Sequence, residues 1–507
     1  MTKDYITYSR ENGGRVLLLF LLFSLSLYSF INSGINGMAM YLALPFSIIF
    51  VYLAFSYRLF TFWILFLVNY FAMFLIKERI WPSSIPASLP NELLEIILIA
   101  IAIIDLRESH FEKLANLMLI GILGWCAYCV LEIFNDTCGL GINVGAWFTG
   151  IRLMAFQLLY AVIVFALYIN NPKRIYKLLN VWACCTIFSV FWCWKQINIG
   201  WTDGERAWLF DQGHATQHMV NGIIRYFGTF TDAANFGIHM AAASCVFYII
   251  AITNKIKKNK LFFGVVGLLC TWAMFQSGTR TAIFCMIAGF MVFLVLSRSA
   301  KIIIPVSIAF GLFIGMLMFT NIGQGNNQIR RMRSAFNPED ASANTRSINK
   351  QAISKYMKDA PWGIGIGIFA QDIPAWNRYK ILAAIPPDSE YVFIWVRTGW
   401  IGVSWFFICN IIMLGGACWT VFFRIKNRSL MGIGAAWCAG FTALHLGGYA
   451  NQVLMQFPNI VIFYGGLTTV FFLPILEKDF EEYETKELAI ETEKKRLKLE
   501  KKLAKRV

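Results

Sequence analysis

The chain has 507 residues, of which 58% are hydrophobic, 16% aromatic and 15% charged, and its formal net charge is +16. Soluble proteins carry roughly a quarter of charged residues, so this composition excludes a set of ordinary soluble domains. Apolar runs long enough to cross a bilayer, about 17–25 residues each, recur along the sequence instead. The composition therefore predicts a polytopic helical membrane protein.

The first apolar run follows a basic N-terminus with Lys3, Arg10 and Arg15. This pattern resembles a signal peptide, but no small-residue cleavage site follows it, so we expect a retained first helix. Fourteen apolar runs are expected to span the membrane, at residues 16–32, 38–55, 59–76, 91–104, 114–134, 151–169, 176–194, 233–253, 261–276, 282–296, 302–320, 391–423, 430–449 and 458–476. We therefore predict an all-α polytopic membrane protein with about 12–14 transmembrane helices.

The loops between these runs differ in charge. Alternate loops carry clusters of Lys and Arg, at residues 58, 107–113, 173–177, 255–260, 298–301 and 424–428. Short cytoplasmic loops collect Lys and Arg because positively charged segments stay on that side of the membrane. These loops, and with them the N- and C-termini, are therefore expected to be cytoplasmic.

Two long loops fall on the other, periplasmic side, at residues 195–232 and 321–390. A loop as long as the second is uncommon and is usually functional or partly folded. We predict transmembrane helices 1–11 in residues 1–320, a large, partly helical periplasmic loop in 321–390 and the last three helices in 391–476. The remaining residues, 477–507, alternate acids and bases at helical spacing and predict a charged, solvated cytoplasmic helical tail.

Within the large loop, Ser342 or Asn344 can cap a helix that continues to about Lys358. Its apolar face would comprise Ile348, Ala352, Tyr356 and Met357, and its polar face Arg346, Asn349 and Lys350. One interpretation is an amphipathic helix that lies on the protein with solvated charges. The alternative is that the basic face binds an anionic group at the bilayer surface, such as a lipid phosphate.

Three arginines lie at or next to span ends on the outer side: Arg225, Arg280 and Arg346. Arg225 begins a segment that enters the next span and includes Asn235, and Arg280 lies in the turn 277–282. Each arginine alone is typical of an interfacial anchor. Three on one side, two of them in glycine-containing turns, favour an anion-binding site.

Two acidic residues, Asp388 and Glu390, lie at the mouth of a span that also contains Arg397. Acidic residues are favoured at a helix start by the helix dipole, which is the structural interpretation. The functional alternative is a general base close to a substrate at the membrane surface. Just upstream, residues 361–367 (PWGIGIG) lack the strand context and spacing of a nucleotide-binding loop, so they predict a flexible or close-packed turn.

No metal or cofactor site is expected from the sequence. The five histidines, His110, His214, His218, His239 and His445, are scattered and form no ligand motif with carboxylates. The sequence also lacks a Ser-His-Asp signature, a phosphate-binding Walker loop and a nucleic-acid-binding module.

Taken in order, these segments resemble the successive sequence blocks of the bacterial O-antigen ligase and O-antigen polymerase superfamily. The blocks are Arg225 to Asn235 with Gly228, the Ser277–Arg280 turn, Arg346 with residues 361–367, and Asp388–Tyr391 with Gly399–Gly402. Together they extend from Arg225 to Gly402. Each block has low specificity, whereas the ordered set, with a large external loop before the last spans, is considerably more specific.

The resemblance implies a multi-helix glycosyltransferase of the bacterial inner membrane. Such an enzyme acts at the periplasmic face on undecaprenyl-diphosphate-linked oligosaccharide, without metal or nucleotide sugar. It implies that Arg280 and Arg346 stabilise the diphosphate and that Arg225 positions either the donor or the loop. Glu390, or alternatively Asp388, would accept the proton of the acceptor hydroxyl. Asn235, Lys350 and Arg397 are further expected substrate-binding residues.

One departure from the family pattern affects the choice of acceptor. Ligases that transfer glycan to lipid A core have a histidine near the end of the large loop, and residues 321–390 contain none. This favours an O-antigen or exopolysaccharide polymerase over a ligase. A flippase, or a structural subunit of a polysaccharide export complex, is a further alternative. Expected partners are the lipid-linked oligosaccharide and membrane lipid, with a chain-length regulator or the export machinery as candidate protein partners.

Overall fold

The computed structural model describes residues 20–21, 23–25, 27–28, 49–81, 85–105, 111–220, 222–333 and 341–503. The chain divides into two compact units, Met1–Ile64 and Leu65–Val507. In the first unit, the described residues from 49 onward are almost entirely helical. Most of the first two predicted spans lies outside the described residues. So do Lys3, Arg10, Arg15 and His110.

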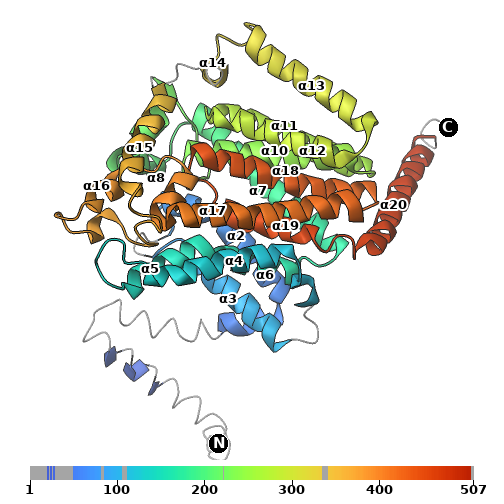
Figure 1. The fold of residues 1–507 in the computed structure, drawn as a ribbon. Helices are drawn as coiled ribbons and strands as arrows, with labels where there is room; N and C mark the ends of the chain where they lie inside the picture. Colours follow the sequence, from blue (N-terminus) through green and yellow to red (C-terminus); the bar gives the residue numbers. More distant parts are fainter. Residues whose placement is uncertain are drawn as a thin grey trace, which may run out of the picture. The chain divides into compact units, whose positions relative to one another are not determined.

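Helices make up nearly all of the regular structure in the described residues (Figure 1). The helices up to Asn198 are α2 (Arg58–Lys77), α3 (Ser88–Ile104), η1 (Phe111–Leu114), α4 (Leu117–Leu131), η2 (Glu132–Phe134), α5 (Val144–Ile151), η3 (Arg152–Phe156), α6 (Gln157–Tyr168) and α7 (Pro172–Asn198). The next segment holds α8 (Asp203–Arg206), η4 (Ala207–Asp211), α9 (Ala215–His218) and a short antiparallel hairpin of β1 (Met219–Val220) and β2 (Ile223–Ile224).

The second half of the chain is also helical. Its elements are α10 (Ala233–Thr253), α11 (Lys257–Gln276), α12 (Thr281–Ser297), α13 (Ala300–Phe319), α14 (Asn327–Arg333), α15 (Ala341–Met357), η6 (Ala370–Asp372), α16 (Tyr379–Ala384), α17 (Glu390–Trp419), η7 (Thr420–Arg424), α18 (Arg428–Ala450), η8 (Ile460–Tyr464), α19 (Gly465–Val470) and α20 (Glu477–Leu503). The large loop is thus partly helical, as the sequence predicts.

Seven helical stretches of the described residues are long and apolar enough to cross a membrane. They are Arg58–Lys77, Leu117–Phe134, Val144–Tyr168, Pro172–Asn198, Ala233–Thr253, Glu390–Arg424 and Arg428–Ala450. Three shorter apolar helices are Thr281–Ser297, Ile303–Met316 and Ile460–Val470. The prediction of an all-α membrane protein is therefore confirmed. Two further predicted spans are also helical, namely α3, which has 17 residues and contains Glu92 and Glu95, and α11, which begins with a lysine-rich turn.

The centre of the second unit is α10, which is apolar on all sides and almost completely buried. Asp232 caps its first turn by accepting hydrogen bonds from the backbone N–H groups of Ala234 (2.7 Å) and Asn235 (3.0 Å). Helices α11, α12 and α18 pack around it (Figure 1). A Cβ atom at Gly447 of α18 would lie 2.4 Å from Ile238 of α10, so a glycine is required for this close helix contact.

Helix α17 is broken near its start. Gly399 has φ 68° and ψ −174°, a backbone conformation that only glycine adopts readily. The break frees carbonyl groups of the preceding turn, and the 361–367 segment satisfies them. Ile364 N–H donates to Val396 C=O (2.9 Å) and Gly365 N–H to Arg397 C=O (3.0 Å). The sequence left open whether 361–367 is a flexible or a close-packed turn, and the structure shows a close-packed one.

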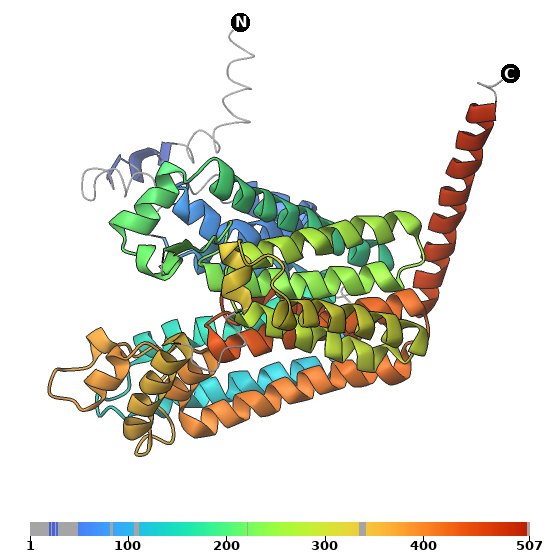
Figure 2. The ribbon, with the colours of Figure 1, turned by 90° about the horizontal axis from the view of Figure 1, so that it is seen from above.

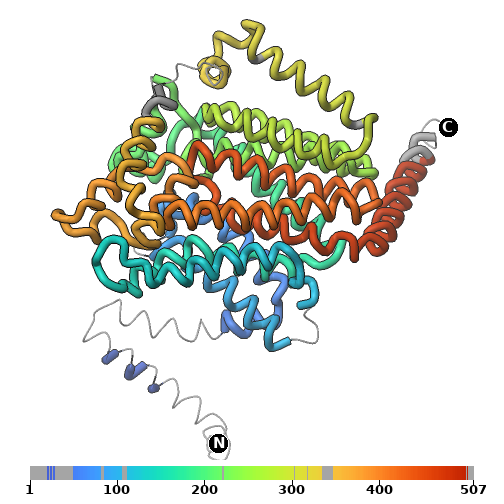
Figure 3. Tube along the Cα trace, viewed as in Figure 1, coloured from blue at the N-terminus to red at the C-terminus, as the bar shows by residue number. Residues whose placement is uncertain are grey.

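The large loop and the tail lie at opposite ends of the helices of the second unit. Figures 1 and 2 both place α15 and α16 at one end and α20 at the other. In Figure 3 the Cα trace runs from α13 into α14, which lies towards the end that carries α15. The first turn of α17 and the start of the tail are therefore separated by the length of the bundle.

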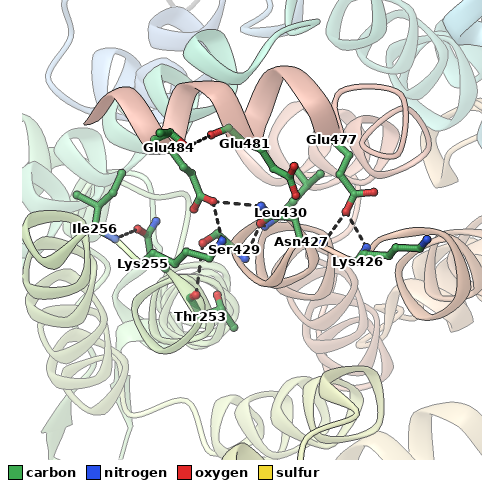
Figure 4. A network of polar contacts seen from close by, with 12 residues as sticks. Thr253, Lys255, Ile256, Lys426, Asn427, Ser429, Leu430, Glu477, Glu481 and Glu484 are labelled. Atoms are coloured by element: carbon green, nitrogen blue, oxygen red, sulfur yellow. Dashed lines mark hydrogen bonds and ion pairs between the residues drawn. The ribbon is translucent and has the colours of Figure 1, made fainter. Parts of the chain in front are cut away.

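The tail is not wholly solvated at its base, contrary to the prediction from its charge pattern. Phe480 is fully buried, with its ring centroid 5.5 Å from that of Tyr176. Glu484, which is 2% exposed, accepts hydrogen bonds from Lys255 (3.2 Å) and Asn427 (3.1 Å), as Figure 4 shows. Glu477 accepts from the backbone N–H of Lys426 at 2.8 Å. These contacts attach the first two turns of α20 to the loops before α11 and α18.

Candidate functional site

Arg225 follows the β1–β2 hairpin and is held by groups of the turn before α12. Its Nη2 donates to Thr279 Oγ1 (3.1 Å), its Nε to Ser277 C=O (3.4 Å) and its Nη1 to Gln217 C=O (3.1 Å). The backbone N–H of Arg225 donates to His218 C=O at 2.8 Å. Arg225 is therefore fixed from several directions and joins the outer loop 195–232 to the Ser277–Arg280 turn.

The Ser277–Arg280 turn is organised by its own hydroxyl groups. Thr279 Oγ1 donates to Ala233 C=O at the start of α10 (2.8 Å), and Thr279 N–H donates to Ser277 Oγ (3.1 Å). Ser277 and Thr279 are both buried. Arg280 then immediately precedes α12, where the fixed turn orients its backbone.

Arg331 in α14 is a fourth arginine at this turn, and the sequence did not single it out. Its Nε donates to Gly278 C=O at 2.9 Å. Gln328, from the same helix, donates to Ile224 C=O at 2.8 Å. Helix α14 thus lies across both the hairpin and the turn, so the start of the large loop belongs to the site. The large distance in sequence between Arg331 and residues 277–280 explains why spacing gave no signal for it.

The sequence predicted that Arg346 lies near the start of its helix; because α15 already begins at Ala341, Arg346 lies in its second turn, near the acidic segment before α17. Asn349, one turn later, donates a hydrogen bond of 2.9 Å to Asp388. Asp388 also interacts electrostatically with Arg346 and partly offsets the lowering of its pKa by burial. The apolar face of α15 differs from the prediction, because Ile353 is buried while Ile348 is 65% exposed. The helix is turned so that its basic face lies over the start of α17.

The guanidinium groups of Arg225, Arg280, Arg331 and Arg346 lie close enough to repel one another electrostatically. Burial, together with repulsion from three other arginines, lowers the pKa of Arg225 to about 10, although Asp232 acts in the opposite direction. Those three are Arg331, Arg280 and Arg346. Burial also lowers the pKa of Arg280, again with repulsion from Arg331 and Arg346. The three arginines predicted from the sequence are therefore close together, and Arg331 joins them to form a four-arginine cluster.

A cavity of about 670 Å³ adjoins this cluster between α15 and the start of α17. Its charged and polar lining includes Arg346, Asn349, Lys350, Asp388 and Ser389, and its aromatic lining Tyr391, Trp395, Trp400 and Tyr449. A cavity lined by both basic groups and aromatic rings can accept the phosphate and the sugar of one amphipathic molecule. We call it the basic cavity.

The two predicted acidic residues face different surroundings. Asp388 lines the basic cavity, whereas Glu390 is 3% exposed and accepts a hydrogen bond of 2.9 Å from the backbone N–H of Leu454. Glu390 instead lines a second, smaller cavity of about 180 Å³, together with Arg397. Of the two carboxylates, only Asp388 therefore faces the space beside Arg346.

Asn235 has a structural environment. It is completely buried, donates a hydrogen bond of 2.9 Å to Phe457 C=O and accepts one of 2.7 Å from Asn459. It lines neither of the two cavities. Asn235 therefore attaches α10 to the loop after α18 and does not lie at the basic cavity. Lys350, another expected substrate-binding residue, does line the basic cavity.

No group of three or more His, Cys, Asp or Glu side chains that could hold a metal ion is found among the described residues. The histidines within the described range are separate. His218 is buried and stacks edge-on against Phe227, and burial lowers its pKa to about 3. His239 and His445 are buried between helices. None of these three lines the basic cavity.

Comparison with known protein families identifies part of the chain. Residues 265–407 match the family model described as O-antigen ligase. The matched segment contains three arginines of the cluster and both Asp388 and Glu390, while Arg225 precedes it. No curated protein matches the chain.

Proposed function

We propose that this chain is a member of the O-antigen ligase and polymerase superfamily, whose ligase model residues 265–407 match, and that it transfers a glycan from a lipid diphosphate to an acceptor hydroxyl. The observation that carries the proposal is the four-arginine cluster beside the basic cavity, with Asp388 in its wall. A diphosphate is the natural ligand of several guanidinium groups, since each can bind two oxygen atoms.

The reaction has a simple balance of bonds. The bond between C1 of the donor sugar and the diphosphate oxygen breaks, and a bond between C1 and the acceptor oxygen forms. The acceptor proton passes to a carboxylate, and the lipid diphosphate leaves with the bonding electrons and an additional negative charge. Arg280 and Arg346 stabilise that charge, and Arg225 and Arg331 position the turn that carries Arg280.

We assign the proton-accepting role to Asp388 in preference to Glu390. Asp388 lies beside Arg346 in the basic cavity, and the Glu390 carboxylate is engaged by backbone N–H groups. A general base must come within hydrogen-bond reach of the proton that it accepts, so its position is the first criterion. Neither metal nor nucleotide sugar is part of this proposal.

The site is assigned to the periplasmic face of the bacterial inner membrane, and both termini to the cytoplasm. The basic clusters of the short loops support this orientation, because such clusters stay on the cytoplasmic side. The cluster at residues 255–260 lies at the same end as the tail, since its Lys255 contacts Glu484 at the base of α20. The large loop with Arg346 lies at the other end of the bundle (Figures 1 and 2). Lipid-linked oligosaccharide would therefore bind at the outer surface.

We favour polymerisation of lipid-linked repeat units, with ligation to lipid A core or another acceptor as the alternative. The absence of histidine from residues 321–390 supports this choice. Deletion of the gene in its host separates the two activities. Single capped repeat units on the surface would indicate a polymerase, whereas long lipid-linked polymer without attachment would indicate a ligase.

Substitution of the arginines tests the diphosphate site. Arg280→Lys and Arg346→Lys keep the charge but lose the planar fork, so each should reduce product at least roughly tenfold at normal membrane levels. The matched control is Arg330→Lys. Arg330 lies in α14, but it is exposed, and its Nη2 donates a hydrogen bond to the nearby Asn327. Wild-type amounts of glycan from both variants would contradict the proposal.

A further inference from the structure

The first turns of α17 separate two cavities. Tyr391, Val392 and Trp395 line the basic cavity, and Glu390, Phe393 and Arg397 line the second cavity of about 180 Å³. This alternation follows from helical geometry, since residues three or four positions apart share a face. The two cavities therefore lie on different faces of the same helix start, with residues 389–391 between them.

The second cavity contains two buried polar atoms that lack hydrogen-bond partners among the described residues. One is Nη1 of Arg397, a residue that is only 6% exposed, and the other is Oε1 of Gln456. Buried polar groups in folded proteins are nearly always satisfied, so an unsatisfied donor and acceptor in one cavity require an explanation. A ligand that supplies both an acceptor and a donor satisfies them together.

Two phenylalanine side chains, Phe369 and Phe393, line the second cavity beside Arg397. The guanidinium carbon of Arg397 lies 4.4 Å from the ring centroid of Phe369 and 5.4 Å from that of Phe393. Two of the lining residues are partly exposed, Phe369 by 39% and Leu153 by 40%, so the cavity has a rim at the protein surface. A ligand can therefore enter from outside and place an apolar ring face on a phenyl ring.

A sugar ring fits these features. Its hydroxyl groups both accept and donate hydrogen bonds, as Arg397 Nη1 and Gln456 Oε1 require, and its C–H face packs on aromatic rings. A diphosphate would not fit as well, because the second cavity contains Glu390 and only one arginine. The four-arginine cluster lies instead on the side of the basic cavity, which Arg346 lines.

We propose that the second cavity binds a sugar unit of the acceptor glycan, through Arg397 and Gln456. This inference rests on the proposed function. With the donor diphosphate in the basic cavity, the attacking hydroxyl must reach C1 from the side away from the leaving oxygen. A binding site on the other face of the α17 start keeps this sugar unit of the acceptor apart from the donor diphosphate, while the attacking unit of the same glycan extends to Asp388 in the basic cavity.

The test uses two probes that distinguish the cavities in full-length protein reconstituted in nanodiscs. The first is the host's repeat-unit oligosaccharide released from its lipid diphosphate, and the second is inorganic pyrophosphate. Gln456→Leu replaces the amide with a shorter apolar side chain and so removes the hydrogen-bonding oxygen. It should weaken oligosaccharide binding roughly tenfold or more, as expected for loss of one buried hydrogen bond, and leave pyrophosphate binding unchanged.

Arg346→Lys should show the reverse pattern, with weaker pyrophosphate binding and unchanged oligosaccharide binding. Equal oligosaccharide affinity of Gln456→Leu and wild type, or no oligosaccharide binding to wild type, would overturn the acceptor site and indicate a cavity that holds water only. Unchanged pyrophosphate binding by Arg346→Lys would count against the proposed function instead. If Gln456→Leu unfolds at a lower temperature than wild type, Arg397→Lys provides the second variant, with the same expected loss of oligosaccharide binding.

Discussion

The side-chain amide of Asn349 donates a hydrogen bond of 2.9 Å to the carboxylate of Asp388, and so joins α15 to the segment that begins α17. Arg346 lies one helical turn before Asn349 and faces the same cavity. The large loop is therefore a component of the site and holds an arginine and a carboxylate next to each other.

Asp388→Asn should lower turnover about 100-fold or more, because a positioned general base contributes typically 10²–10⁴-fold. The folded protein should persist, since an asparagine can keep the contact to Asn349. The measurement is transfer of lipid-linked oligosaccharide by reconstituted protein. Asp359→Asn is the control, because Asp359 forms an exposed ion pair with Arg378 (3.1 Å). Turnover of Asp388→Asn equal to that of the control would show that Asp388 is not the base.

Gly399→Ala should strongly destabilise the protein. The backbone at Gly399 has φ 68° and ψ −174°, which costs any other residue about 1–3 kcal/mol. An added Cβ would in addition lie 1.8 Å from the carbonyl oxygen of Pro361. We expect reduced membrane levels and a lower thermal unfolding midpoint in detergent.

Gly415→Ala is the matched control for this substitution. Gly415 lies in the regular part of α17, and nothing lies within 4 Å of its Cβ position. Alanine in a helix interior is favoured over glycine by up to about 1 kcal/mol, so this variant should be as stable as wild type or slightly more so. If both variants had the same midpoint, the break in α17 would not depend on Gly399.

Glu484→Ala should release the base of the tail helix. Hydrogen bonds to a charged group contribute about 1.5–3 kcal/mol each, and Glu484 accepts two, from Lys255 and Asn427. Because Lys255 is half exposed, we expect the loss of stabilisation of the tail to lie in the lower part of this range. The tail should then detach more often, and tryptic cleavage at Lys486 should be roughly tenfold faster. Glu482→Ala removes an exposed carboxylate of the same helix and should not alter cleavage. Equal cleavage of both variants would show that Glu484 does not hold the tail.

The four-arginine cluster should bind anions less well at strongly alkaline pH. Burial lowers the pKa of Arg225 to about 10, below its value in the unfolded chain, so the folded state loses this proton first as pH rises. Between pH 10 and the unfolded pKa, the unfolded state binds more protons, and the stability of the unliganded protein should rise with pH. The charge of sulfate is constant over this range. Sulfate should therefore raise the thermal unfolding midpoint more at pH 8, where Arg225 is charged, than at pH 11, where it has largely lost its proton.

Arg225→Gln provides the comparison for this pH effect. It removes the titrating group, so the change of the sulfate effect between pH 8 and 11 should be smaller than in wild type. Arg225 has three side-chain contacts to the neighbouring loops, so the variant is used only if its unfolding remains cooperative. A sulfate effect of the same size at both pH values in wild type would contradict the assignment of the lowered pKa to the anion site.

The membrane-spanning helices could be predicted closely because each is encoded by its own residues. The predicted span 233–253 coincides with α10, Ala233–Thr253, since Asp232 caps its start and the apolar run ends with it. The break at Gly399 was not predicted. It depends on the distant Pro361 segment, which supplies N–H groups for the freed carbonyls.

By itself the sequence determined the fold class and the apolar helices, and it predicted that Arg225, Arg280 and Arg346 belong to one site. Only the tertiary structure decided that Arg331 joins these arginines, that Asp388 and Glu390 face different cavities, and that Asn235 lies away from the basic cavity. The physical reason is the range of the interactions. Helix formation and membrane insertion depend on nearby residues, whereas the direction of a side chain depends on the helices that pack against it from elsewhere in the chain.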